Sequence, residues 1–219
     1  NKLDPSLKIC IVERLDQVAH ESTDGWNNAG TGHAAYCELN YTPEAEDGDV
    51  DISKALHINA SFEVTLQFWS HLVKTGALPT PKEFINRTPH KSFVWGEKNV
   101  EFLRKRHELM SAHHLFESME YSEDPAQLAK WMPLVMTGRK QDDPVAATRV
   151  HHGSDVDFGS LARDMVEHLQ QQDSFELLLG HSVEDMKRSA KEGWSVLLED
   201  NKTGEITRVR SKFVFLGAG

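Results

Sequence analysis

The feature that most constrains the fold is the run Leu7-Lys8-Ile9-Cys10-Ile11-Val12, which is apolar or β-branched at nearly every position. Such a run predicts a strand buried on both faces, as the strands of parallel sheets are. Cys10 is expected to be a buried free thiol, and two cysteines are too few for a disulfide framework, which favours a reducing compartment. The run therefore predicts one strand of a parallel sheet.

Charge and the length of the apolar runs exclude two classes of protein. The 219 residues contain 24 Lys and Arg against 34 Asp and Glu, a net charge of -10, whereas nucleic-acid binding requires a basic surface. The one basic run, Arg104-Lys105-Arg106, is expected to be the solvated face of a helix. The longest apolar run, residues 213–219, is far shorter than the ~20 residues of a membrane-spanning helix. We expect neither a nucleic-acid partner nor an integral membrane segment.

Apolar residues at three- and four-residue steps predict a long amphipathic helix over residues 52–75, which Gly76 follows as a C-cap should. Further helices are predicted at residues 97–112, 125–131 and 158–172.

The remaining segments are expected to be strands and loops. Residues 22–42 are rich in Gly, Asn, Thr and Ser and predict a loop that opens into a short helix. Residues 91–95 predict a short strand, and residues 133–157 are expected to be irregular. Turn signals then separate a strand, predicted at residues 175–179, from an antiparallel meander. The meander strands are predicted at residues 182–189, 194–199, 205–210 and 213–216.

A glycine-rich motif lies in the predicted loop. Gly30-Thr31-Gly32-His33-Ala34-Ala35 matches the pattern G-x-G-x-x-A of dinucleotide-binding turns. That motif requires a buried strand directly before it, and residues 21–29 are too polar to form one. The segment therefore matches the letters of the pattern but lacks the preceding strand that a dinucleotide-binding turn requires.

Glu13 carries a stronger signal, because dinucleotide-binding folds place an acidic residue at the end of a buried strand to accept hydrogen bonds from the adenosine ribose. The glycine-rich turn of those folds lies roughly 20 residues before the acid. Counting back from Glu13 passes Asn1, so we expect the first βα unit to be absent from this chain. The alternative is a glutamate that faces solvent.

The 12 histidines do not form a recognisable metal site. His107-Glu108 is not followed by a histidine at the spacing of a zinc-binding helix. The adjacent pairs His113-His114 and His151-His152 direct neighbouring side chains apart in most backbones. We expect no metal.

Four segments together resemble the malate:quinone oxidoreductases, FAD-dependent enzymes of the wider group that includes D-amino-acid oxidase and 2-hydroxyglutarate oxidases. They are Glu13-Arg14-Leu15, the stretch from Asn27 to Ala35, the stretch from Asp155 to Leu161, and Phe213-Val214-Phe215-Leu216-Gly217-Ala218-Gly219. The resemblance covers essentially the whole chain but lacks the family's glycine-rich opening and its second half, which implies a partial chain.

The resemblance implies an FAD-binding role for each matching residue. Glu13, followed by Arg14, would hold the adenosine ribose. The loop that contains Asn27, Asn28, Thr31 and Gly32 would follow the pyrophosphate and ribityl chain, where backbone N–H groups can bind phosphate oxygens. His33 completes an Asn-x-Gly-x-x-His pattern that places its histidine beside the flavin ring in related hydroxy-acid oxidases.

Later in the chain, Val183 would meet the adenine through its backbone. Gly217 and Gly219 would let a returning strand approach the cofactor closely.

The implied reaction removes a proton from the hydroxyl group of a 2-hydroxy acid while hydride leaves the same carbon for the flavin. Histidine titrates in the range that such a base requires. His33 is the expected flavin-proximal residue, and His151 or His152 is a candidate base. Arg149 is a candidate cation for the substrate carboxylates.

The implied fold is α/β: an incomplete Rossmann-like FAD-binding domain, residues 1–50 and 151–219, with an inserted α+β substrate or cap domain, residues 51–150. The implied activity is oxidation of (S)-malate to oxaloacetate, a step of the tricarboxylic acid cycle, with electrons passing to membrane quinone. The enzyme would be a peripheral protein at the cytoplasmic face of the membrane.

Two alternatives remain open. One is a flavoenzyme that oxidises another 2-hydroxy acid or an amino acid. The other is a non-catalytic helical interaction module built on residues 51–150.

Overall fold

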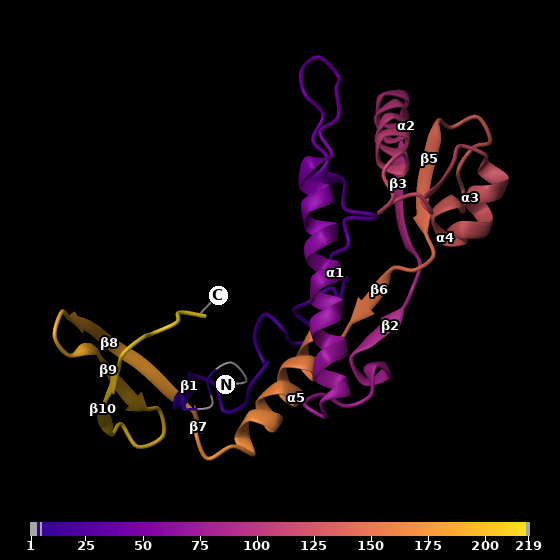
Figure 1. Ribbon diagram of the computed structural model, residues 1–219. Helices are drawn as coiled ribbons and strands as arrows, with labels where there is room; N and C mark the ends of the chain where they lie inside the picture. The colour runs from indigo at the N-terminus through magenta and orange to yellow at the C-terminus, as the bar shows by residue number, and fades with distance from the viewer. Residues whose placement is uncertain (1–3, 5, 218–219) are drawn as a thin grey trace. The chain divides into compact units, whose positions relative to one another are not determined.

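A computed structural model describes residue 4 and residues 6–217 (Figure 1). The helices are α1 (Ser53–Lys74), α2 (Glu97–Ser111), α3 (Pro125–Trp131), α4 (Pro133–Met136) and α5 (Phe158–Gln170), with 3-10 turns at Leu39–Tyr41 and Pro81–Glu83. The strands are β1 (Ile9–Glu13), β2 (Ile85–Arg87), β3 (His90–Trp95), β4 (Glu120–Ser122), β5 (Val145–Val150), β6 (Ser154–Val156), β7 (Phe175–Leu179), β8 (His181–Ser189), β9 (Gly193–Asp200) and β10 (Ile206–Ser211).

The chain divides into two compact units. The first unit comprises Asn1–Gly30, Val73–Phe84 and Asp157–Gly219, and the second comprises Thr31–Leu72 and Ile85–Val156. Relative to the domain boundaries expected from the sequence, residues 31–50 and 151–156 belong with the second unit, and a short stretch at 73–84 belongs with the first.

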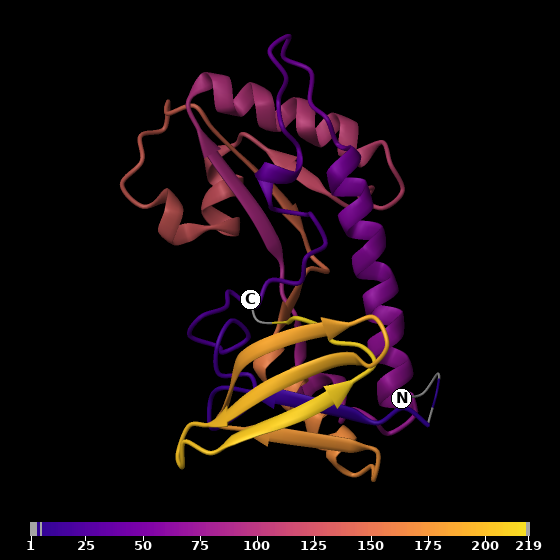
Figure 2. The same cartoon turned by 90° about the vertical axis from the view of Figure 1, so that its left-hand side faces the viewer.

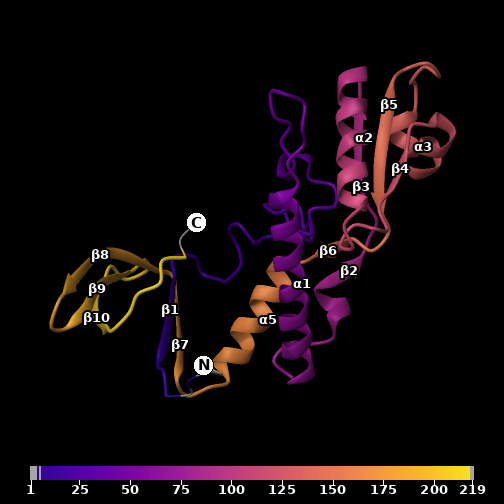
Figure 3. The same cartoon turned by 45° about the horizontal axis from the view of Figure 1, so that its top comes forward.

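A parallel strand pair forms part of the first unit. Strand β1 pairs with β7 in a register that runs from Ile9 opposite Phe175 to Glu13 opposite Leu179 (Figure 3). The parallel pairing agrees with the expectation from the apolar run. The expected burial of Cys10 is wrong, because its side chain is exposed. The expected burial of the strand on both faces is also wrong, because none of its five residues is fully buried. Among residues 4 and 6–217, β7 is its one strand partner.

The predicted antiparallel meander is confirmed as the sheet β10-β9-β8, which Figure 2 shows in orange and yellow. A register shift between Val183 and Asp185 marks a β-bulge in β8. The predicted fourth strand at 213–216 is wrong, since this segment pairs with no strand in the described part of the chain. Phe213, Phe215 and Leu216 are exposed there.

Helix α5 begins where its sequence supplies a cap. The Asp157 carboxylate accepts hydrogen bonds from the backbone N–H of Ser160 at 2.8 Å and from its hydroxyl at 2.7 Å. Such capping satisfies N–H groups that the helix itself leaves free. These bonds hold the pKa of Asp157 below its ordinary value.

The second unit contains the sheet β3-β5-β4, in which the central strand is one that the sequence did not predict. Residues 133–157 are not irregular as expected, because they contain α4, β5 and β6. Strand β5, Val-Ala-Ala-Thr-Arg-Val, is buried at five of its six positions, so it shows no apolar and polar alternation. Central strands covered on both faces lack the period of two by which strands are recognised.

Successive side chains of β5 pack against different helices. Ala146 packs with Val94, Val100 and Leu103 in a cluster that includes α2. Val145 and Ala147 pack with the α3 residues Leu128 and Trp131. Two helices therefore cover the two faces of the sheet, and the direction in which each β5 side chain points follows from its position along the strand.

The long predicted helix is confirmed as α1, and Gly76 follows it with a positive φ of 74°. A short antiparallel pair, β2 and β6, continues the second unit. In the chain apart from residues 1–3, 5, 218 and 219, no helix has the length and apolar character needed to cross a membrane.

Candidate functional site

The residues expected to bind a cofactor are divided between the two units. Glu13, Arg14, Asn27, Asn28, Val183 and Gly217 lie in the first unit, and Thr31, Gly32 and His33 lie in the second with His152 and Arg149. Gly219 lies outside the residues that the structure describes.

Glu13 is the last residue of β1, at the carboxyl end of a parallel strand. Its Oε1 accepts a hydrogen bond from the backbone N–H of Leu15 at 2.8 Å. The carbonyl of Arg14, the next residue, accepts a hydrogen bond from Asn201 Nδ2 at 3.0 Å. A partly exposed carboxylate at this end of a parallel strand fits the position that a ribose hydroxyl pair requires.

The loop before Gly30 is held by its own asparagines. Asn27 Nδ2 donates to the carbonyl of Glu21 at 3.0 Å, and Asn28 Nδ2 donates to the carbonyl of Ser22 at 3.1 Å. Asn28 Oδ1 accepts from the N–H of Gly30 at 2.7 Å. Both side chains therefore shape the loop, and a ligand here would meet mainly its backbone.

Val183 is exposed beside the bulge of β8, where the pairing of backbone groups with β9 is interrupted. Gly217 is exposed, and a Cβ at its position would meet only the ring of Phe215, at 3.4 Å.

In the second unit, the segment before His33 is packed closely against β6. The N–H of Gly32 donates to the carbonyl of Ser154 at 2.8 Å, and Thr31 forms a bridge with Asp155. A Cβ on Gly32 would lie 2.8 Å from Cβ of Ser154 and 2.9 Å from Cζ of Phe62. Only glycine fits at this approach, so the motif glycine has a packing role that its formal pattern did not reveal.

His33 is exposed, whereas the three residues after it, Ala34, Ala35 and Tyr36, are buried. Its Nδ1 lies 3.5 Å from the hydroxyl of Tyr41. The segment thus presents one imidazole outward from a backbone fixed on its inner side.

Arg106 provides much of that inner anchor, and its expected exposure on a helix face is wrong: its side chain is fully buried. Its guanidinium donates to the carbonyls of Ala35 and Tyr36 and to the hydroxyl oxygen of Thr42, the last at 2.9 Å. Burial lowers the pKa of Arg106 to about 10, while the charges of Cys37 and Glu38 act in the opposite direction.

The spacing of Arg106 on its helix was a usable signal. Val100, Leu103 and Met110 lie on the buried face of α2, and position 106 falls on the same face at helical spacing. The expectation from sequence placed Arg106 in solvent, because charged arginine side chains are rarely buried.

His152 is the second histidine of the site. Its Nε2 lies 3.0 Å from the hydroxyl of Tyr36, and the two rings meet edge to face with centroids 5.2 Å apart. Partial burial of the imidazole lowers the pKa of His152, and the charge of Arg87 lowers it further. The ring is therefore neutral near pH 7 and able to accept a proton.

Arg149 does not stand free. Its Nε donates to Oε2 of Glu120 at 2.7 Å, and its guanidinium lies 4.4 Å from the ring centroid of Trp131. Oε2 of Glu120 is also 3.1 Å from Nε2 of His151. Any substrate carboxylate at Arg149 would have to share it with Glu120.

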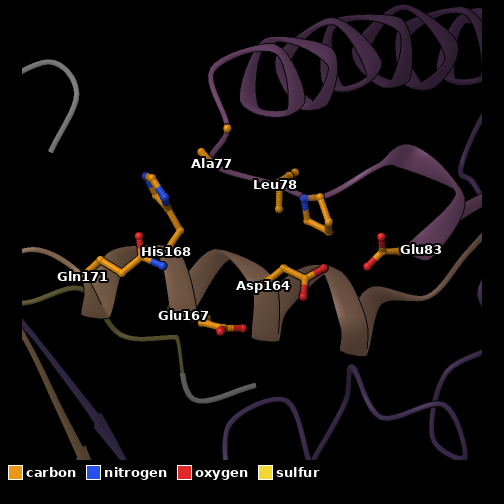
Figure 4. A pocket seen from close by; sticks show the side chains of 9 residues that line it. Ala77, Leu78, Glu83, Asp164, Glu167, His168 and Gln171 are labelled. Carbon is orange, nitrogen blue, oxygen red and sulfur yellow. The ribbon is translucent and has the colours of Figure 1, made fainter.

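The first unit has a separate hollow of about 300 Å³ between α5 and residues 76–83 (Figure 4). Asp164, Glu167 and His168 reach it from α5, and Glu83 reaches it from the opposite side. Burial raises the pKa of Asp164, and the charges of Glu83 and Glu167 raise it further. Within residues 4 and 6–217, no group of three or more His, Cys, Asp or Glu side chains is arranged to hold a metal ion.

Curated relatives match the chain over its entire length. The probable malate:quinone oxidoreductase of Hahella chejuensis is 64% identical over 218 residues, which is 100% of this chain and 44% of the relative. The corresponding protein of Methylobacillus flagellatus is 59% identical over 219 residues, again 100% of this chain and 44% of the relative. The chain thus spans less than half the length of these relatives.

Solved structures show the same fold at low identity. Glycine oxidase from Geobacillus kaustophilus has a TM-score of 0.58 and 10% identity, covering 93% of this chain and 46% of that one. L-α-Glycerophosphate oxidase from Mycoplasma pneumoniae, solved with FAD bound, has a TM-score of 0.50 and 11% identity, covering 85% and 42%. The expected α/β fold of flavin-dependent oxidases is confirmed.

The sequence model of the malate:quinone oxidoreductase family matches residues 1–219 of this chain. With that match and the identity to curated relatives, this chain belongs to the malate:quinone oxidoreductase family.

Proposed function

We propose that the protein to which this chain belongs oxidises (S)-malate to oxaloacetate with FAD as cofactor and passes the electrons to membrane quinone. The observation that carries the proposal is the 64% identity, over the whole chain, to a relative named for malate and quinone. The associated proposals are a role in the tricarboxylic acid cycle and a peripheral position at the cytoplasmic face of the membrane.

We assign the FAD-binding part to residues 1–50 and 151–219, and the substrate part to residues 51–150. The position of Glu13 at the end of a parallel strand supports an adenosine ribose there. The close packing of Gly32 against Ser154 supports a fixed backbone directly before His33. The other residues assigned to FAD are Arg14, Asn27, Asn28, Thr31, Val183, Gly217 and Gly219.

Three side chains are assigned to the reaction. His33 would lie beside the flavin, and His152 would accept the proton of the malate hydroxyl group. Arg149 would bind a substrate carboxylate while it still contacts Glu120. Bound flavin would supply the acceptor for the hydride.

The test is the visible spectrum of the full-length protein and its response to substrates without oxygen. We expect flavin absorbance that bleaches with malate but not with lactate or 2-hydroxyglutarate. A protein without flavin absorbance would exclude both flavoenzyme functions and leave the interaction module. Bleaching by another hydroxy acid or an amino acid instead of malate would select the second enzyme function.

His33→Ala tests the assignment within the site. We expect it to retain FAD and to lose bleaching by malate. Bleaching at the wild-type rate would remove His33 from the reaction.

A further inference from the structure

Helix α4 has apolar side chains on two sides, although it is short. Met132, which precedes the helix, and Met136, its last residue, lie one helical turn apart, and both are partly buried against the core cluster that contains Trp131. Leu134 and Val135 lie between them in the chain and are 89% and 41% exposed. The inner side of α4 therefore belongs to the core of the second unit, and its outer side meets solvent.

Arg139 joins this outer side to strand β3. Its Nε donates to the carbonyl of Val135 at 3.0 Å, so the turn after α4 folds back on the helix. Its guanidinium lies 4.7 Å from the ring centroid of Phe93 and 5.9 Å from that of Trp95. The two rings are stacked with centroids 6.4 Å apart, and Trp95 is 62% exposed. Trp95, Leu134, Val135 and Arg139 thus form one surface, which we call the α4 patch.

The charge around the α4 patch differs from that of the chain as a whole. Residues 125–141 contain Lys130, Arg139 and Lys140 and no Asp or Glu, whereas the whole chain has a net charge of -10. Lys130 and Lys140 are exposed. Within residues 4 and 6–217, none of these three cations forms an ion pair with a carboxylate. Their positive charge is therefore available to an anion outside the chain.

Two carboxylates border this basic stretch. Asp142 and Asp143 follow it, and Asp143 Oδ2 accepts a hydrogen bond from the backbone N–H of Lys140 at 3.1 Å. Acidic groups farther away matter less, because exposed charges are screened beyond about 10 Å at physiological ionic strength. Attraction of the patch to an anionic surface is thus modest, and apolar side chains have to supply most of the binding.

The surface of a lipid bilayer has the chemistry that this arrangement requires. Apolar side chains such as Leu134 can enter the boundary of the acyl chains, and tryptophan rings are favoured at the level of the headgroups. Arginine and lysine place their charges at the lipid phosphates while their aliphatic stems lie along apolar surface. The α4 patch presents these three kinds of side chain together.

We propose that the α4 patch is the surface by which the full-length protein binds an anionic lipid bilayer, with Leu134 inserted and Arg139 and Lys140 at the lipid phosphates. This inference rests on the proposed function, because the quinone that accepts the electrons lies in the membrane. It goes further by naming the residues that make the contact. The alternative occupants are the rest of the full-length protein and a second copy of it.

Co-sedimentation of the full-length protein with vesicles of equal parts phosphatidylcholine and phosphatidylglycerol tests the proposal. We expect Leu134→Ser to weaken vesicle binding about tenfold, since it removes an inserted apolar side chain. Lys140→Gln should weaken binding by up to about fivefold on these vesicles and leave binding to pure phosphatidylcholine unchanged. Val64→Ser is the matched control, because Val64 is an exposed apolar residue of α1, and this variant should bind as the wild type does.

A second measurement uses tryptophan emission and keeps Leu134 in place. Lipids with brominated acyl chains should quench part of the emission of the wild type and less of it in Trp95→Phe. Trp26→Phe is the control, since Trp26 is also exposed but lies in the first unit, and its quenching should match that of the wild type. If Leu134→Ser fails to fold, the comparison of Trp95→Phe with Trp26→Phe decides.

Vesicle binding of Leu134→Ser equal to that of the wild type would overturn the proposal. A loss of stability in its place would mean that the rest of the protein covers the patch, and a change of oligomeric state would mean that a second copy does. Wild-type protein that binds no vesicles would overturn it as well. Wild-type protein that binds vesicles but is not bleached by malate would defeat the proposed function and leave the α4 patch as a lipid-binding surface.

Discussion

Arg106 donates a hydrogen bond from Nε to the hydroxyl oxygen of Thr42 over 2.9 Å, and both residues are completely buried. The same guanidinium binds the carbonyls of Ala35 and Tyr36. One side chain of α2 thus fixes both ends of the segment that follows His33.

Replacing Arg106 with Met should destabilise the full-length protein by about 3 kcal/mol, because buried carbonyl oxygens would lose their donors. Urea denaturation measures the change. Arg104→Met is the control: Arg104 is exposed, pairs with Glu123, and should cost at most about 1 kcal/mol. Equal losses in the two variants would contradict the anchoring role of Arg106.

Gly32→Ala should destabilise the protein by about 1–3 kcal/mol, because a Cβ there would lie 2.8 Å from Cβ of Ser154 and force that contact apart. Thermal unfolding reads the effect. Gly25→Ala is the control, since no atom lies within 4 Å of the Cβ it would add, and its Tm should stay close to that of the wild type. If the Gly32→Ala variant were as stable as the Gly25→Ala variant, β6 would be able to shift away from the added Cβ at little cost in free energy.

Glu120→Gln should lower stability at pH 7 by up to about 1 kcal/mol, a limit set by solvent screening of a partly exposed pair. The hydrogen bond from Arg149 lowers the pKa of Glu120. A depressed folded-state pKa stabilises the fold above the ordinary value of 4.5, and this contribution disappears as pH falls through the folded-state pKa. The difference between variant and wild type should therefore vanish in acid, and a difference that persists below that pKa would show another cause.

Asp164→Asn should stabilise the protein at neutral pH by about 0.2–0.5 kcal/mol, the magnitude of a like-charge pair three residues apart on a helix. Burial and the charges of Glu83 and Glu167 raise the pKa of Asp164. A carboxyl with a raised folded-state pKa favours folding below its unfolded pKa and loses that contribution as pH rises through the folded value. The gain should appear at neutral pH and be absent near pH 3, and an equal gain at both would argue against a charge effect.

Sequence predicted the elements whose pattern is local. The steps of apolar residues along α1 and α5 and the turn signals of the meander all act within a few positions, and the structure has these elements. The parallel setting of β1 also followed from its continuous apolar run. The family resemblance supplied the α/β flavin fold, which periodicity alone would not have given.

What sequence did not predict depends on partners far along the chain. Strand β5 is buried by α2 on one side and α3 on the other, so its own residues carry no alternation. Cys10 is exposed because the burial of a strand is decided by what lies over it. Arg106 can be buried because the carbonyl oxygens of residues 35 and 36 accept hydrogen bonds from its guanidinium, and no local sequence pattern encodes that pairing.

The anchor of the segment after His33 also sets an order of events during synthesis. Residues 35–42 leave the ribosome well before Arg106, which is 64 to 71 positions later than the groups it binds. Those carbonyls cannot bind the guanidinium until α2 has been made, and contacts between groups so distant in sequence cost more chain entropy to close than local ones. We therefore expect the backbone that presents His33 to reach its final form only after α2 has folded.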